Sequence, residues 1–289
     1  MFTSLMSNRL YTTYEDTPSQ GPGTSAVSIG RNLSPVLWKH VGGNGMTPTG
    51  LDGGSGLFDD FNAYHTAAAA GACGQWAFDE ANAATAASLL TEKGGVLRLA
   101  SVGTDNDGGG IFGGSMFQID GDLSASTSTK VIFEARIRKS IAAASSVFVG
   151  LTKYDVTTVD GVLADGGTMV DDDFIGFQVT EAAPTTLVFT YKADGATQQT
   201  PISYSTALNA SDYVKVGFAF LPSAKTGERL QVSVDNQVLG SVAQSSIFTT
   251  SAVSTFPDTI AMRPVAAVKS HTAAANTLDL DWVACWQED

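Results

Sequence analysis

Alternation of apolar and polar side chains is the feature that most constrains this chain. In residues 131–138 (VIFEARIR), Val131, Phe133 and Ile137 fall on one face of an extended strand, while Glu134 and Arg136 fall on the other. The same period of two recurs in residues 214–220 and 230–234. A helix would instead repeat its apolar positions every three to four residues. The chain is therefore predicted to be built from half-buried β-strands.

Turn residues divide the alternating segments and predict how they connect. Asp235 and Asn236 follow the strand at 230–234 and precede a return strand at 238–242, which predicts a hairpin. Leu278, Leu280, Trp282 and Trp286 form the last alternating run. Further strands are predicted at 57–62, 75–78, 96–101, 111–119, 146–153, 173–180, 186–192, 199–204 and 259–268. About a dozen strands with Gly, Asp and Asn turns describe an all-β, antiparallel β-sandwich or barrel.

Residues 79–93 (DEANAATAASLLTEK) fit two structures. Asp79 could cap an alanine-rich helix that ends at the following glycines, or the segment could cross irregularly and include a short strand. Its position between predicted strands favours the irregular crossing.

Residues 1–56 differ from the rest of the chain and are interpreted as an extended N-terminal arm, with the sandwich domain at 57–289. Short apolar patches alternate with glycine-rich turns there, and patches of this size bury little surface unless they dock on a partner. The alternative is that the arm folds onto its own sandwich as an edge strand and loops. Arginine and aromatic residues dominate interface hot spots, so the predicted interface residues are Arg9, Tyr11, Tyr14, Arg31, Leu37 and Trp38.

Composition excludes several classes of partner. The chain has 289 residues with 16 Lys plus Arg against 29 Asp plus Glu, and its net charge is −13. Nucleic-acid binding needs clustered cations, which are missing from the sequence, so no nucleic-acid partner is expected. No stretch approaches the ~20 apolar residues of a membrane span, so no membrane partner is expected. Residues 1–9 lack the pattern of an export signal, and Cys73 and Cys285 are interpreted as reduced thiols, which predicts synthesis in the cytoplasm.

Two acidic turns are candidate calcium sites. Asp105 and Asp107 lie in one, Asp171 and Asp173 in the other, and calcium binds six to eight oxygen ligands of this kind. Neither turn has the ligand spacing of an EF-hand, and solvated turn acids are the alternative. No other cofactor is predicted.

The sequence contains no recognisable catalytic motif. Retaining β-sandwich glucanases carry their carboxylates as E-x-D-x-x-E on one strand face, and this string is absent. Asp279 and Asp281 share a strand face and are interpreted as a solvated face. No serine lies in G-x-S-x-G, and the three histidines are scattered. The sequence therefore predicts a protein without enzymatic activity.

Eight segments, taken in order, resemble a recurrent class of tailed-bacteriophage structural proteins that have a concanavalin A-like or laminin-G-like jelly-roll domain. The resemblance covers about residues 57–287 and lies in the order of the segments. They are GGVLRL (94–99), TDND (104–107), IFEARIR (132–138), FVGL (148–151), DDFIGF (172–177), YVKVGF (213–218), VSVDN (232–236) and LDLDWV (278–283).

The resemblance implies a jelly-roll sandwich in a virion protein that decorates or cements a capsid. It implies the major capsid protein as partner, a homotrimer, and a location on the capsid surface. A module that binds host glycans is the second hypothesis, and a β-sandwich glycoside hydrolase is the third.

Overall fold

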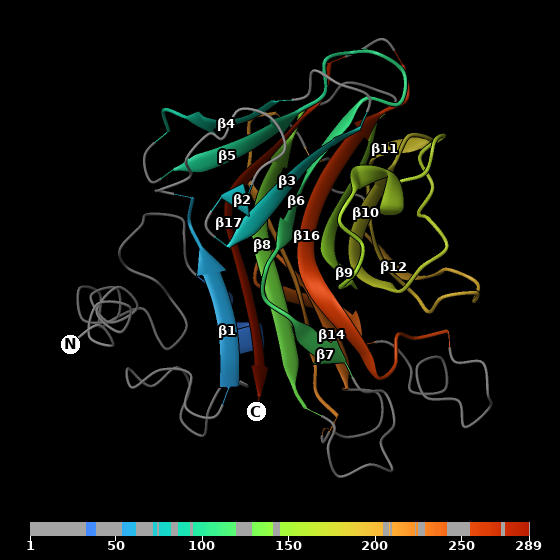
Figure 1. Ribbon diagram of the computed structural model, residues 1–289. Coiled ribbons are helices and arrows are strands. Elements are labelled where there is room, and N and C mark those ends of the chain that lie inside the picture. Colours follow the sequence, from blue (N-terminus) through green and yellow to red (C-terminus); the bar gives the residue numbers. More distant parts are fainter. Residues whose placement is uncertain are drawn as a thin grey trace.

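Two antiparallel β-sheets pack face to face in the computed structural model (Figure 1). The structure describes residues 33–38, 54–61, 72–73, 75–81, 86–92, 95–119, 129–140, 145–204, 208, 210–222, 224, 229–241, 255–272 and 275–288. Within these residues, helix is confined to the single turn α2 (Pro35–Trp38) and the 3₁₀ turn η1 (Val159–Gly161). The predicted all-β sandwich is confirmed.

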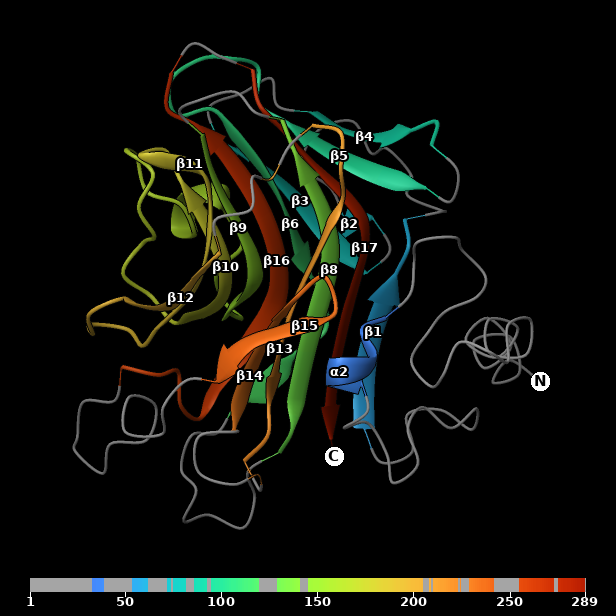
Figure 2. The ribbon, with the colours of Figure 1, turned by 180° about the vertical axis from the view of Figure 1, so that it is seen from behind.

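Sheet I faces the viewer in Figure 2, and sheet II faces the viewer in Figure 1. Sheet I has the order β15-β14-β13-β8-β17-β5-β4, with β1 also pairing β17, and sheet II the order β12-β11-β10-β9-β16-β6-β3-β2, with β7 also pairing β16. The strands of sheet I are β1 (Gly54–Asp59), β4 (Ala86–Leu90), β5 (Val96–Ala100), β8 (Val131–Lys139), β13 (Val214–Phe220), β14 (Leu230–Val234), β15 (Gln237–Ser241) and β17 (Thr277–Glu288). Those of sheet II are β2 (Ala72–Cys73), β3 (Trp76–Ala81), β6 (Gly108–Gly113), β7 (Phe117–Ile119), β9 (Ser145–Lys153), β10 (Phe174–Thr180), β11 (Ala183–Lys192), β12 (Gln199–Tyr204) and β16 (Ile260–Ser270).

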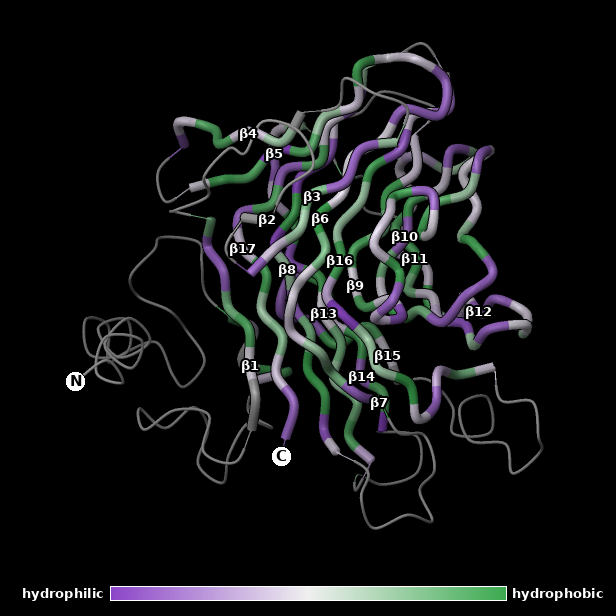
Figure 3. Tube along the Cα trace, viewed as in Figure 1, coloured by the Kyte–Doolittle hydropathy of each residue, from purple (hydrophilic) through white to green (hydrophobic). Residues whose placement is uncertain are grey.

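The main core lies between the two sheets and is built from the alternate positions that the sequence predicts. Phe133 of β8 and Phe218 of β13 stack with their ring centroids 5.6 Å apart, and Phe189 of β11 meets Phe218 from the opposite sheet at 5.8 Å. Figure 3 shows the resulting alternation of hydrophobic and hydrophilic residues along the strands. Cys285 is a free thiol within this core, and burial raises its pKa well above the usual value.

Local turn chemistry sets the predicted hairpin. Asp235 and Asn236 connect β14 to β15 with φ of 47° and 66°, and two positive φ values match the right-handed twist of the flanking strands. In the ambiguous segment, β3 runs on to Ala81 and residues 86–90 form β4, so a short strand is present there, as the sequence favoured.

A β-bulge in β17 corrects the prediction that its four large residues share one face. The pairing of β17 with β8 shifts register between Leu280 and Trp282. Leu278 and Leu280 therefore face the main core, whereas Trp282 and Trp286 lie in a second cluster on the outer face of sheet I. A bulge inserts one residue into the strand and so reverses the sides of all that follow. Period-two reasoning misses it because a bulge leaves no mark in the hydrophobic pattern.

Residues 33–38 cover this outer cluster, which we name the second core. Leu33, Leu37 and Trp38 pack there against Ile132, Ala219, Leu221, Trp282, Ala284 and Trp286. The main chain of β13 leaves room for them, since a Cβ on Gly217 would lie 2.6 Å from Cδ1 of Leu37. Figure 2 shows α2 lying on sheet I.

A buried carboxylate fixes the same segment. Glu134 of β8 accepts hydrogen bonds from the backbone N–H of Ser34 (3.0 and 3.2 Å to its two oxygens) and from Nε1 of Trp38 (2.8 Å). Burial raises the pKa of Glu134, because water no longer stabilises its charge. The polar group and the apolar cluster together seat residues 33–38 on the sandwich.

The expectation that Leu37 and Trp38 are free to contact a partner is therefore wrong for these two side chains. Leu37 is 0% and Trp38 4% exposed, and both are used inside the chain. β1 also begins at Gly54, three residues before the predicted start of the sandwich domain, and pairs with β17. These contacts match the alternative in which parts of residues 1–56 fold onto their own sandwich.

Replacing Leu37 tests this packing. We expect Leu37→Ala to lower the free energy of unfolding by about 2–5 kcal/mol, the usual cost of a cavity at a buried leucine. Chemical denaturation measures it, with Val238→Ala as the control because Val238 is 45% exposed. Equal stability of Leu37→Ala and wild-type protein would contradict the packing of residues 33–38.

Candidate functional site

The four predicted calcium ligands do not converge. Asp171 forms an ion pair with Lys192 and accepts from the backbone of Gly195, and Asp173 accepts from the backbone N–H of Asp194 at 3.2 Å. Asp107 is buried and accepts from the N–H of Thr104 at 3.2 Å, while Asp105 is exposed. Across the described residues, no group of three or more His, Cys, Asp or Glu side chains is arranged to hold a metal ion. Of the predicted interface residues, Arg9, Tyr11, Tyr14 and Arg31 lie outside the described residues.

On the outer face of sheet I, Asp279 and Asp281 are buried rather than solvated, which corrects the sequence interpretation. Asp279 accepts two hydrogen bonds from Arg98 (2.6 and 2.8 Å) and two from Arg138 (2.7 and 2.9 Å), and Asp281 pairs with Arg136. Both oxygens of Asp279 are thus committed to guanidinium groups. This network can position strands β5, β8 and β17, but it offers no free acid or base.

A long segment between β9 and β10, residues 154–173, crosses the outer face of sheet II, and we call it the strap. Its apolar side chains join a third cluster with residues of the sheet. The cluster consists of Phe112, Phe148, Val156, Val162, Leu163, Met169, Phe174, Val265 and Ala267. Glycines of β6 make room for η1, because a Cβ on Gly110 would come within 3.0 Å of the side chain of Val159.

Polar groups of sheet II hold the strap in place. Nζ of Lys269, a residue 1% exposed, binds Asp160 (2.7 Å), Asp165 (2.6 Å) and the carbonyl of Leu163 (3.1 Å). Ser146 donates to the carbonyl of Gly167 at 3.0 Å, and Nε2 of His271 lies 3.1 Å from the Ser146 hydroxyl. Ser146 is fully buried, so this serine–histidine pair anchors the strap and is closed to substrate.

Tyr154, the first residue of the strap, marks its edge. Its N–H donates to the carbonyl of Ala261 in β16 (2.8 Å), and its hydroxyl lies 3.4 Å from the carbonyl of Gly114. Between these two points the ring covers Arg263 of β16, whose guanidinium carbon is 4.4 Å from the ring centroid. Tyr154 is 36% exposed, and Met116, two residues beyond Gly114, is 60% exposed. This edge is the candidate functional site.

Sequence reasoning missed this site. Arg263 is a lone cation inside the apolar run 260–268 (IAMRPVAAV), and that break in an otherwise apolar strand was the available signal. The partner Tyr154 lies more than 100 residues away, and pairing of β9 with β16 brings the two together.

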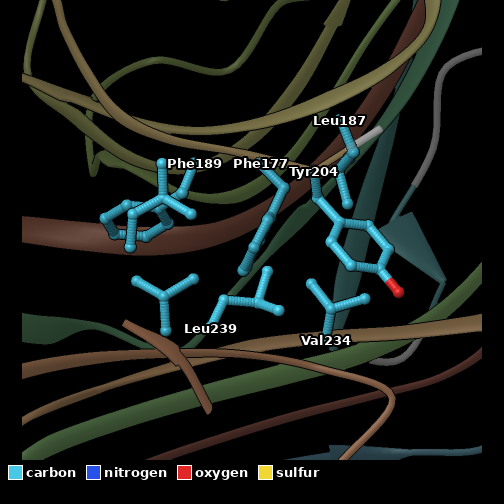
Figure 4. A pocket seen from close by; sticks show the side chains of 8 residues that line it. Phe177, Leu187, Phe189, Tyr204, Val234 and Leu239 are labelled. Carbon is cyan, nitrogen blue, oxygen red and sulfur yellow. The ribbon is translucent and has the colours of Figure 1, made fainter. Parts of the chain in front are cut away.

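A narrow apolar gap lies between the two sheets (Figure 4). Phe177, Phe189 and Tyr204 of sheet II line it opposite Val234 and Leu239 of sheet I. Phe177, Phe189 and Val234 belong to the main core, and Leu239 packs against it. We therefore assign the gap to the core.

Because Lys269 forms ion pairs with Asp160 and Asp165, the stability of the strap on sheet II should depend on pH. The hydrogen bond from Lys269 lowers the pKa of Asp165 below 3.8, so this carboxylate contributes stability above its unfolded pKa and loses it as the pH falls through the lowered value. Below pH 3.8, we expect hydrogen-exchange protection of the Val162 and Gly167 amides to fall as Asp165 becomes protonated. Lys269→Met should reduce the protection of these two strap amides at every pH, while the Val149 amide in β9 stays protected. Unchanged strap protection in Lys269→Met would contradict this anchoring.

No protein-family model matches the sequence, and no curated protein sequence matches it. Among solved structures, the endo-β-1,3(4)-glucanase SCLam of family GH16 is similar with a TM-score of 0.54 and 12% identity, over 81% of this chain and 90% of that chain. The laminarinase from Rhodothermus marinus has a TM-score of 0.54 and 12% identity, over 80% and 95%. The carbohydrate recognition domain of Emp46p has a TM-score of 0.46 and 12% identity, over 73% and 88%.

These similarities correct one expectation from the sequence. The expectation of a protein without enzymatic activity rested on the absence of catalytic motifs, and it is corrected here, because endo-glucanases share this fold and the fold therefore does not exclude an enzyme. The described residues contain no helix long and apolar enough to cross a membrane. By its fold, this chain is a concanavalin A-like jelly-roll β-sandwich of the type seen in the GH16 glucanases.

Proposed function

We propose that this protein binds carbohydrate at the edge of the strap on sheet II. The observation that carries the proposal is the exposed ring of Tyr154, whose backbone β16 holds in place and whose hydroxyl donates to the carbonyl of Gly114. Sugar rings present apolar C–H faces, and a fixed aromatic ring offers them a rigid contact surface at small entropic cost.

The fold supports the same function. The two solved structures with TM-scores of 0.54 are enzymes named for β-1,3(4)-glucan and laminarin, so the architecture is compatible with polysaccharide recognition. The outer face of sheet I is occupied by residues 33–38 and by the arginine–aspartate network, whereas the strap on sheet II leaves Tyr154 exposed at its edge.

A glycan panel with a matched pair of variants tests carbohydrate binding. We expect saturable binding to at least one oligosaccharide, and Tyr154→Ala should weaken it by about tenfold, equivalent to about 1.4 kcal/mol of stacking. Phe58→Ala is the control, because Phe58 is also exposed (41%) but lies on sheet I against Trp282. The same affinity in Tyr154→Ala and wild-type protein would remove Tyr154 from the site, and an absence of binding across the panel would refute the function.

Glycoside hydrolysis is a second candidate function, favoured by two carboxylates where β3 meets the strap. Asp79 accepts from the N–H of Val159 at 2.7 Å, burial raises its pKa, and the negative charge of neighbouring Asp160 raises it further. Asp160 itself pairs with Lys269. Glycoside hydrolysis uses one carboxyl group as acid and a second as nucleophile or base, and Asp79 and Asp160 are two interacting carboxyl groups at this place.

Reducing-end release from β-1,3(4)-glucan tests hydrolysis. On this hypothesis wild-type protein releases reducing ends, and Asp79→Asn lowers the rate by about a hundredfold, as expected for loss of a general acid. Asp155→Asn, which removes an exposed acid of the same strap, should leave the rate unchanged. Absence of release from wild-type protein, or full activity in Asp79→Asn, would contradict this candidate.

The resemblance to bacteriophage structural proteins leaves separate hypotheses. A place on a capsid surface, the major capsid protein as partner and a homotrimeric assembly stay predictions from the sequence. Glycan binding at Tyr154 is compatible with them, since a virion protein can also carry a module that binds host glycans.

A further inference from the structure

Arg263 is a buried cation for which the described part of the chain supplies no counter-ion. Its residue is 8% exposed, its Nε is buried without a hydrogen-bond partner, and within the described residues it forms no ion pair. Its one side-chain contact of note is the ring of Tyr154, 4.4 Å away. This occurs in a chain whose net charge is −13, where acidic side chains are plentiful.

Such an arrangement is costly unless it serves a ligand. Arginine is almost never buried without a partner, because its charge loses water and its five N–H donors need acceptors. Three half-buried arginines of the sandwich have carboxylate partners: Arg98 and Arg138 bind Asp279, and Arg136 binds Asp281. A ring stacked on a guanidinium stabilises the charge but leaves the N–H donors in its plane unsatisfied.

Resting on the proposed carbohydrate function, we propose that the ligand is an acidic saccharide whose anionic group binds Arg263 while its sugar ring packs on Tyr154. A guanidinium presents paired, parallel N–H donors that match the two oxygens of a carboxylate, as in a uronic acid. A sulfate ester has the same acceptor chemistry. The ring of Tyr154 lies over the guanidinium, so a ligand that contacts the ring places substituents near the edge of Arg263.

The surroundings favour one anion over a highly charged partner. Lys153 directly precedes Tyr154. Its Nζ lies 3.6 Å from a carboxylate oxygen of Asp155 and 3.6 Å from one of Asp172, so its charge is already balanced. Among the described residues, the site thus offers one unbalanced positive charge beside the exposed ring of Tyr154. That combination fits a saccharide with one acidic group for each ring and does not fit a polyanion such as nucleic acid, which needs several cations.

Calorimetric titration of the whole chain tests the proposal with three classes of probe: oligouronates, sulfated oligosaccharides and neutral β-1,3(4)-gluco-oligosaccharides. We expect an acidic class to bind more tightly than the neutral class, and the two acidic arms show which anion is preferred. Arg263→Met should weaken acidic binding roughly 10- to 100-fold, the usual loss of a charge-assisted hydrogen-bond pair. The affinity of Arg263→Lys for the acidic class should lie between those of wild type and Arg263→Met, because lysine keeps the charge but lacks the paired donors. Lys130→Gln makes the same change in net charge next to β8, and its affinity for the acidic class should stay within about twofold of wild type, because Lys130 is paired with Glu288.

Each outcome decides the proposal. The proposal is overturned if Arg263→Met has wild-type thermal stability and binds acidic saccharides with unchanged affinity. Binding of neutral glucans alone, unaffected by Arg263→Met, also overturns it and leaves the carbohydrate function standing. If no class binds, the carbohydrate function fails and this inference fails with it. If Arg263→Met does not fold, Arg263→Lys carries the comparison, and unchanged acidic affinity in that variant counts against paired recognition.

Discussion

Both sheets of this sandwich carry apolar side chains on their outer faces, and the rest of the structure depends on covering them. An antiparallel sheet usually has one face in the core and one in water. Here Trp282 and Trp286 emerge on the outside of sheet I, and Phe112, Phe148 and Phe174 on the outside of sheet II. Residues 33–38 cover the first cluster and the strap covers the second. At each of these places a covering segment adds a third layer to the two sheets.

Polar groups set where each cover sits, because apolar contact alone has little directional preference. Glu134 receives the backbone of Ser34 and the indole of Trp38, and Lys269 reaches through the strap to two exposed aspartates. In both cases a buried ionisable group of the sheet is hydrogen-bonded by the segment that covers it. Arg263 lies at the point where the strap begins, and there no such partner is present among the described residues. The contrast with Glu134 and Lys269 is the reason to assign Arg263 to a ligand.

The sequence predicts the strands well, but it predicts poorly the two segments that cover their outer faces, residues 33–38 and the strap. Alternation in residues 131–138 and the Asp235–Asn236 turn are local, so they identify β8 and the β14–β15 hairpin directly. The bulge at Asp281, the burial of Asp279 and the stacking of Tyr154 on Arg263 depend on which strands pair, and no local pattern encodes that. The acidic turns show the same dependence on the fold. Asp171 matches a calcium ligand by composition, and the fold pairs it with Lys192.

The state of the Arg263 side chain tests the central claim most directly. Nitrogen-15 NMR of arginine Nε–H groups reports hydrogen bonding at that atom, which in Arg263 has no hydrogen-bond partner among the described residues. On addition of an oligouronate, the Arg263 resonance should shift and its exchange with water should slow, while the resonance of Arg98, already bound to Asp279, stays in place. An Arg263 resonance that does not respond to any acidic saccharide, or that responds equally to neutral glucans, would contradict the account.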